Sequence, residues 1–232
     1  MTSTVPASLS RTNGSFALQA VFLDMDGTLV DTEGFWWDAE VEVFADLGHR
    51  LDEAWRDIVV GGPMTRSAGY LIEATGADIT IAELTVLLNE KFEQRIDRGV
   101  PMMPGAERLL AELAHHNIPT ALVSASHRRI IDRILASLGR DRFTLTIAGD
   151  EVMRTKPHPE PYLTAASGVG AEPALCAVIE DTATGVAAAE AAGCRVVAVP
   201  SVAPIAPSAG RVVVRSLEDV NVPFLRTFIA SR

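Results

Sequence analysis

Two aspartates stand at the end of an apolar run near the start of the chain. Residues 20–23 are Ala-Val-Phe-Leu, and Asp24 and Asp26 follow at a spacing that places both side chains on one side of a strand. Two carboxylates in this arrangement repel each other, by about 4 kcal/mol at roughly 4 Å and an effective dielectric of about 20. We therefore expect a positive counter-charge beside them.

Polar side chains also end or follow three later apolar runs. These residues are Ser124, Lys156, Glu180 and Asp181. Taken singly, each has an ordinary structural explanation, such as a helix cap, a solvated charge or an acid at the positive end of a helix. Placed together at one edge of a parallel sheet, they indicate chemistry instead.

A divalent cation would relieve the repulsion among these acids. Carboxylate and carbonyl oxygens suit Mg²⁺, whereas the chain has no clustered Cys/His pattern of the kind that binds zinc. Magnesium, a lysine and hydroxyl donors together form a phosphate-binding set, and a carboxylate nucleophile can accept the phosphoryl group as an aspartyl phosphate. The metal and Lys156 would offset the repulsion between the anionic nucleophile and the anionic phosphate.

The apolar runs alternate with helical patterns over most of the chain. Runs that predict strands buried on both faces cover residues 18–24, 119–124, 144–149, 175–180 and 195–200, with a sixth strand expected at an edge over 211–216. Helical patterns cover residues 104–116, 127–139, 159–170 and 182–193. This alternation predicts an α/β fold with a parallel sheet, whose ligands bind beyond the carboxyl ends of the strands.

Residues 34–100 interrupt the alternation. The helical patterns in this interval cover residues 35–48, 51–59, 65–76 and 80–99. An interval of this length is too long for a crossover connection, so it predicts an inserted α-helical cap domain over 34–99. The core would then comprise residues 16–33 and 100–232, and residues 1–15 would form a loose, flexible tail.

The composition narrows the classes of partner. The chain has 232 residues and a net charge of −10, which gives no general attraction for nucleic acid or an anionic membrane surface. Cys176 and Cys194 are too few for a disulfide framework, and neither a membrane span nor a secretory signal is expected. We expect a cytoplasmic protein, a monomer or a small homo-oligomer, that acts on a small molecule.

At this point the motifs resemble those of a known family. DMDGT (24–28), Ser124, Lys156 and the Glu180-Asp181 pair resemble, in order and context, the four motifs of the haloacid dehalogenase (HAD) superfamily. The insert is similar to the α-helical cap of the subfamily that contains β-phosphoglucomutase, phosphoglycolate phosphatase and the hexitol or 2-deoxyglucose phosphate phosphatases. The resemblance implies a Rossmann-like parallel-sheet core with that cap inserted.

The resemblance also implies a role for each matched residue. Asp24 would be the nucleophile, and Asp26 would be first the general acid and then the general base. Ser124 and Lys156 would bind the phosphoryl oxygens, with a backbone amide near Ala125 as a further donor. The implied ligands of Mg²⁺ are Asp24, the backbone carbonyl of Asp26, Glu180 and Asp181.

A residue of the cap distinguishes between the phosphatase and mutase activities of this subfamily. β-Phosphoglucomutase has a histidine on its first cap helix, and counting along the chain places Trp36 there, which favours a sugar- or polyol-phosphate phosphatase over a mutase. Trp36 is expected to wall the pocket or, like Trp37, to pack the cap core. Arg66 follows a Gly-Gly pair and would either reach the substrate or remain a surface charge.

Two further functions are less well supported. Dehalogenation is disfavoured because haloacid dehalogenases lack a counterpart of Asp26 and need no magnesium. A receiver-like phosphorylated signalling module would share an acidic pair, a hydroxyl and a lysine at a sheet edge. Receiver domains, however, have no large insert after the first strand.

Overall fold

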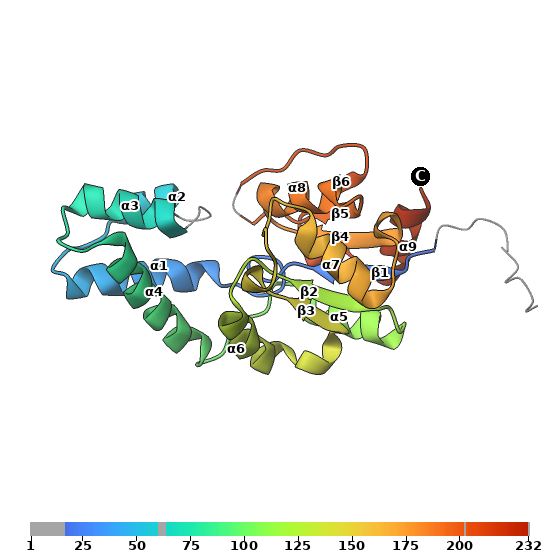
Figure 1. Ribbon diagram of the computed structural model, residues 1–232, viewed down its shortest axis with the longest axis horizontal. Helices are drawn as coiled ribbons and strands as arrows, with labels where there is room; N and C mark the ends of the chain where they lie inside the picture. Colours follow the sequence, from blue (N-terminus) through green and yellow to red (C-terminus); the bar gives the residue numbers. More distant parts are fainter. Residues whose placement is uncertain (1–16, 60–63, 202, 232) are drawn as a thin grey trace, which may run out of the picture.

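The computed structural model describes residues 17–59, 64–201 and 203–231 (Figure 1). Within these residues, six parallel strands form one sheet in the order β3-β2-β1-β4-β5-β6. The strands are β1 (Ala20–Leu23), β2 (Thr120–Val123), β3 (Leu145–Ile147), β4 (Cys176–Glu180), β5 (Arg195–Ala198) and β6 (Arg211–Val213). The predicted α/β fold with a parallel sheet is confirmed.

The predicted burial of the strands is wrong for β3. We expected β3 to be buried on both faces, but its residues are only partly buried. The strand order explains the difference, because β3 forms one edge of the sheet while β6 forms the other, as predicted. The central strands β1, β2 and β4 are buried throughout.

Helices cover both faces of the sheet (Figure 1). They are α5 (Ala106–His115), α6 (Arg128–Leu138), α7 (Glu160–Val169), α8 (Ala183–Ala191) and α9 (Val222–Ala230). Alternate residues of β1 serve opposite faces: Val21 and Leu23 pack with side chains of α5, α6 and α9, whereas Ala20 and Phe22 pack with those of α7 and α8. The helix α9 was not predicted.

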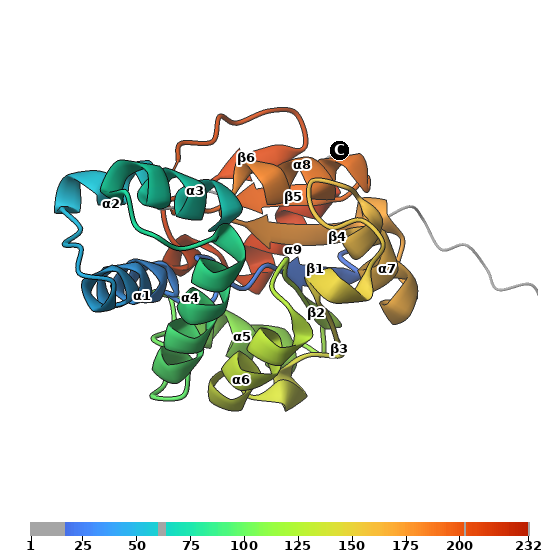
Figure 2. The same cartoon turned by 60° about the vertical axis from the view of Figure 1, so that its left-hand side comes forward.

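Four further helices lie between β1 and β2 in the described residues. They are α1 (Glu33–Asp46), α2 (Glu53–Val59), α3 (Met64–Thr75) and α4 (Ile81–Ile96). They share an apolar cluster of their own and lie together at one end of the molecule (Figure 2). We propose residues 34–99 as the extent of this cap and residues 16–33 and 100–232 as the core; the proposed tail over 1–15 lies outside the described residues.

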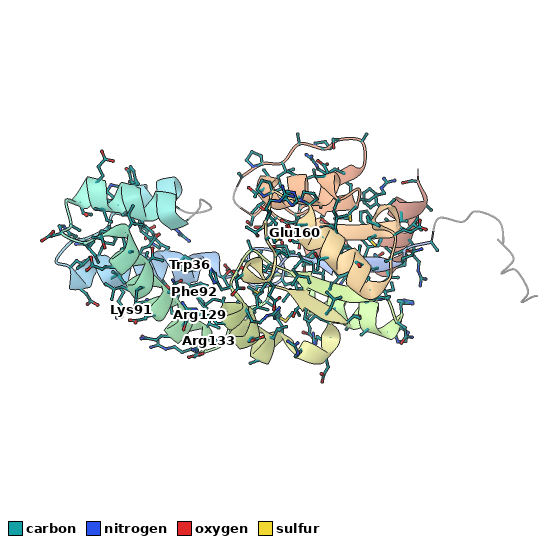
Figure 3. The ribbon with its side chains drawn as sticks, viewed as in Figure 1. Trp36, Lys91, Phe92, Arg129, Arg133 and Glu160 are labelled. Atoms are coloured by element: carbon teal, nitrogen blue, oxygen red, sulfur yellow. The ribbon has the colours of Figure 1, made fainter. Side chains whose placement is uncertain are left out.

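Contacts between α1, α4 and α6 join the cap to the sheet layer. The rings of Trp36 and Phe92 stack with centroids 3.8 Å apart, and Trp36 packs against both the cap cluster and the core cluster (Figure 3). Glu93 on α4 pairs with Arg129 at 2.9 Å and with Arg133 at 3.4 Å, both on α6. The junction is therefore partly apolar and partly ionic.

Candidate active site

Predicted site residues lie at the carboxyl ends of three neighbouring strands. Asp24 follows β1, Ser124 follows β2 and Glu180 ends β4. The backbone N–H of Asp24 donates to the carbonyl of Ile179 at 3.0 Å, and that of Ser124 donates to the carbonyl of Ile147 at 3.1 Å. The sheet ladder thus continues into these residues and fixes where their side chains begin.

Lys156 joins the three strand ends. Its Nζ donates to Asp24 Oδ1 at 2.6 Å, to Glu180 Oε1 at 2.6 Å and to the carbonyl oxygen of Val123 at 2.8 Å. These three acceptors match the three protons of an ammonium group. The lysine side chain is 5% exposed, so its charge is neutralised by the acids rather than by solvent.

Negative charge exceeds positive charge around Lys156. Burial favours the neutral amine, but Asp24 and Glu180 outweigh it and raise the pKa of Lys156 above its ordinary value. Burial is also the largest effect on Asp24, and it raises the pKa of this carboxyl well above the ordinary range against the lowering by Lys156. The neighbouring acids Glu180, Asp181 and Asp26 raise the pKa of Asp24 further.

The acids form a group that fits a divalent cation. One carboxylate oxygen each from Asp24, Glu180 and Asp181 lies within 4.8 Å of the others, and all three residues are buried. Hard oxygen ligands of this kind suit Mg²⁺, and a bound cation would balance the excess negative charge. The carboxylate of Asp26 is not part of this group, so only its backbone carbonyl is retained as the implied ligand.

Two glycines leave the space that these carboxylates occupy. A Cβ at Gly27 would lie 2.2 Å from Asp181 Oδ2, and the φ of +75° at Gly27 is one that side chains rarely adopt. A Cβ at Gly185, in the first turn of α8, would lie 1.9 Å from Glu180 Oε1. The carboxylates can therefore occupy these positions only because residues 27 and 185 have no side chain.

Asp26 is held by hydroxyl groups from two segments. Thr32 Oγ1 donates to Asp26 Oδ1 at 2.8 Å, and Ser126 Oγ donates to Oδ2 at 2.8 Å. Ser124 Oγ donates to the same Oδ2 at 3.3 Å and accepts from the backbone N–H of Ser126. This arrangement fixes the orientation of a carboxyl group that would exchange a proton.

Several hydroxyl residues of the site were missed from the sequence. They are Thr32, Ser126, Tyr162 and Ser201, of which Tyr162 Oη donates to Glu180 Oε1 at 2.6 Å and Ser201 Oγ donates to Asp181 Oδ2 at 2.6 Å. Thr32 and Ser126 stand close to the predicted motifs, and that proximity is a signal that could have found them. Tyr162 and Ser201 gave no comparable signal, because only the fold brings them to the acids.

The remaining predicted residues differ in how far the structure describes them. Ala125 lies in the loop after β2, where its carbonyl oxygen would be 2.2 Å from a Cβ at Gly149. Trp36 lies at the junction of cap and core, and Trp37 is buried in the cap cluster, as expected. Arg66 belongs to α3, but its side chain lies outside the described part of the chain.

Comparison with known proteins identifies the family. A family model described as haloacid dehalogenase-like hydrolase matches residues 18–193. The chain belongs to this family. The prediction of a HAD hydrolase is thereby confirmed, together with its fold.

In the described residues, no helix has the length and apolar character needed to cross a membrane.

Two curated relatives are similar to the chain in sequence, and one solved structure is similar to it in fold. The chain is 34% identical over 183 residues to the bifunctional riboflavin kinase/FMN phosphatase of Arabidopsis thaliana; this covers 78% of the chain and 48% of that protein, so the chain spans about half of its length. It is 30% identical over 195 residues to hexitol phosphatase B of Escherichia coli K12, covering 79% and 84%. A putative β-phosphoglucomutase from Thermotoga maritima superposes with a TM-score of 0.75 at 25% identity, covering 87% and 95%.

Proposed function

We propose that the protein is a Mg²⁺-dependent phosphatase that hydrolyses a small phosphorylated metabolite, of the sugar- or polyol-phosphate class, through an aspartyl phosphate on Asp24. The observation that carries the proposal is the position of Lys156, which bonds Asp24 and Glu180 at 2.6 Å each beside the acidic group. A lysine and a cation site next to a buried carboxylate form an arrangement that binds a phosphoryl group. The similarity to hexitol phosphatase B supports the substrate class.

In the first step, Asp24 attacks phosphorus and the ester oxygen leaves. Lys156 exchanges one of its three acceptors for an oxygen of the transferred group, and Ser124 binds another, so that the group is held in line with the carboxylate. Bound Mg²⁺, held by Asp24, Glu180, Asp181 and a backbone carbonyl, would supply positive charge that lets two anions approach. The product is an acyl phosphate on Asp24 and a free alcohol.

Asp26 carries the proton in both steps. In its acid form it donates to the leaving oxygen, and as the resulting carboxylate it takes a proton from the water that attacks the acyl phosphate. Thr32 and Ser126 hold the two oxygens of Asp26 in place, which keeps the group aimed during both transfers. The cycle ends with inorganic phosphate and the original Asp24 carboxylate.

A mutase is the second candidate, because a putative β-phosphoglucomutase shares the fold at 25% identity. The phosphatase is favoured by the residue at the start of the cap. Trp36 stands where the mutase resemblance calls for histidine, and its indole stacks on Phe92 instead of offering a proton carrier. We propose that Trp36 walls the pocket on the cap side. Arg66 is retained as a proposed substrate contact.

A phosphate-release screen tests the proposal. Hexose, hexitol, glycolate and nucleotide monophosphates are each incubated with the full chain, with Mg²⁺ or with a chelator, and with Asp24→Asn as the blank. We expect Mg²⁺-dependent release from a sugar or polyol phosphate and none above background from the blank. Conversion of β-glucose 1-phosphate to glucose 6-phosphate without release would identify a mutase, and absence of both reactions would overturn the proposal.

A further inference from the structure

Glu40 is a buried acid that the proposed mechanism does not use. It lies on α1, is 6% exposed, and has no hydrogen bond or ion pair with another of the described residues. Burial raises the pKa of this carboxyl to about 7. Because an unpaired buried carboxyl costs free energy in a folded chain, the cap retains this group at the expense of its own stability.

The residues around Glu40 place it at the inner face of the cap. Helical spacing puts Trp36 and Phe44 one turn before and after Glu40, with Trp37 and Val43 at the adjoining positions of the same face. Phe44, Val43 and Trp37 are buried in the cap cluster, whereas Trp36 contacts both that cluster and the core. Glu40 therefore stands one turn along α1 from Trp36, the residue of this face that also contacts the core.

A stripe along α1 connects Glu40 with the site. Thr32, Trp36 and Glu40 follow each other at intervals of one turn, and the hydroxyl of Thr32 is bonded to Asp26. Eight residues of helix rise about 12 Å, and helical side chains tilt back toward the N-terminus, which here is toward Asp26. The carboxyl of Glu40 is thus separated from the Thr32 hydroxyl by roughly the length of an extended five- or six-carbon phosphate ester, with the indole of Trp36 between them.

We propose that Glu40 is a specificity-determining residue that hydrogen-bonds the hydroxyl groups at the end of the substrate remote from its phosphate. The inference rests on the proposed phosphatase function and deepens it, since it selects polyhydroxylated phosphates over apolar ones. A carboxylate accepts from two hydroxyls, and a carboxylic acid donates to one and accepts from another, so both forms suit such a ligand. A substrate without hydroxyls leaves this buried group unpaired, as it is in the free chain, and gains no affinity from it.

The test compares two substrates that differ only in hydroxyl groups: a hexitol monophosphate and n-hexyl phosphate. Phosphate release is measured with Mg²⁺ for the full-length wild type, Glu40→Gln and Glu40→Met. Asp38→Asn is the matched control, because Asp38 is an exposed acid on the same helix. Glu40→Gln keeps the shape and some hydrogen-bonding capacity, and Glu40→Met keeps the volume and removes that capacity. Thermal unfolding of each variant confirms that it is folded.

The expected result is a substrate-dependent loss. For Glu40→Met, kcat/KM on the hexitol phosphate falls by about 10- to 100-fold, mainly through KM, because one or two hydrogen bonds to a charged group are lost. On hexyl phosphate kcat/KM changes little, Glu40→Gln lies between the wild type and Glu40→Met, and Asp38→Asn matches the wild type. Equal losses on both substrates would show that Glu40 only supports packing and would overturn the proposal, as would no loss on either.

A binding measurement separates this proposal from the proposed function. If the wild type releases phosphate from no substrate in the panel, the proposed phosphatase function is wrong. The role of Glu40 is then tested by calorimetry, which measures the affinity of the hexitol phosphate for the Asp24→Asn variant and for the variant that carries both Asp24→Asn and Glu40→Met. Weaker binding with Glu40→Met supports the role of Glu40, whereas equal affinities overturn it.

Discussion

The phenol of Tyr162 on α7 donates a hydrogen bond of 2.6 Å to Glu180 Oε1 at the end of β4. The same oxygen accepts from Lys156 Nζ, so a helix and a loop both hold one carboxylate oxygen of the site. Burial, followed by the charge of Glu180, raises the pKa of Tyr162 well above its ordinary value, and the hydroxyl therefore keeps its proton and remains a donor. Glu180 is in this way held by a residue outside the sequence motifs that predicted it.

Replacing Tyr162 by Phe should loosen this anchor. A buried carboxylate that loses a donor costs about 1.5–3 kcal/mol, so we expect the free energy of unfolding to fall by that amount. We also expect a higher Mg²⁺ concentration for half-maximal phosphate release, because Glu180 belongs to the acidic group. Urea unfolding and a Mg²⁺ titration measure the two effects.

Tyr70→Phe is the matched control for this change. Tyr70 lies on α3, and its hydroxyl has no hydrogen-bond partner among the described residues. Its removal should leave both curves close to those of the wild type. If Tyr162→Phe behaves like this control, the hydrogen bond from Tyr162 to Glu180 contributes neither to stability nor to Mg²⁺ binding.

Adding a methyl group at Gly185 should damage the site from within a helix. Alanine is ordinarily better than glycine in a helix by about 1 kcal/mol, but here its Cβ would lie 1.9 Å from Glu180 Oε1. We expect Gly185→Ala to lower both the unfolding temperature and kcat/KM, the latter by at least about tenfold, since a 1 Å displacement of a catalytic group costs that much or more.

Gly69→Ala provides the comparison for Gly185. A Cβ at Gly69, on α3, would meet only Ile81 Cδ1 at 3.8 Å, which is an ordinary contact. This variant should be at least as stable as the wild type and equally active. An active, stabilised Gly185→Ala enzyme would show that Glu180 can move without consequence.

Glu40 should make stability depend on pH. Its folded pKa of about 7 lies above the ordinary value of 4.5, so the folded state retains a proton that the unfolded chain releases. The stability of the wild type therefore falls, relative to Glu40→Gln, as pH rises from about 4.5 to about 7, by up to about 3 kcal/mol, and the difference stays constant above that range. Below pH 4.5 the protonated acid and the amide should be equivalent.

Chemical unfolding of the two proteins at pH 5 and pH 8 measures this difference. Asp38→Asn, which removes the same formal charge from the exposed face of α1, should follow the wild-type values. A Glu40→Gln variant that is no more stable than the wild type at pH 8 would show that burial does not penalise this carboxylate.

The sheet and the cap helices were largely predictable because their signals are local. Apolar runs such as residues 20–23 mark buried strands, and the rule that parallel strands end at one edge brings Asp24, Ser124 and Glu180 together without further information. The helix α9 was missed, although Asn221 caps it by accepting from the N–H of Phe224 at 2.8 Å. This helix follows the last strand of the described residues, so the alternation of strands and helices that predicts the other core helices does not extend to it.

The supporting residues of the site were less predictable because their partners are set by packing. Tyr162 falls within a correctly predicted helix, but its apolar ring also suits an ordinary core position, and it stacks near Phe22. The hydroxyl of Ser201 meets Asp181 only because β5 lies beside β4. Glu40 has the spacing of a core residue and the chemistry of a surface residue, and the sequence pattern cannot decide between them.

The central claim is that Asp24 carries the phosphoryl group, and chemical trapping tests it most directly. Borohydride reduces an acyl phosphate to an alcohol, so quenching the enzyme during turnover should convert Asp24 to homoserine, which peptide mass spectrometry detects. We predict homoserine at Asp24 only when substrate and Mg²⁺ are both present, with Asp26 unmodified. Steady phosphate release with an unmodified Asp24, or reduction at another residue, would contradict the mechanism.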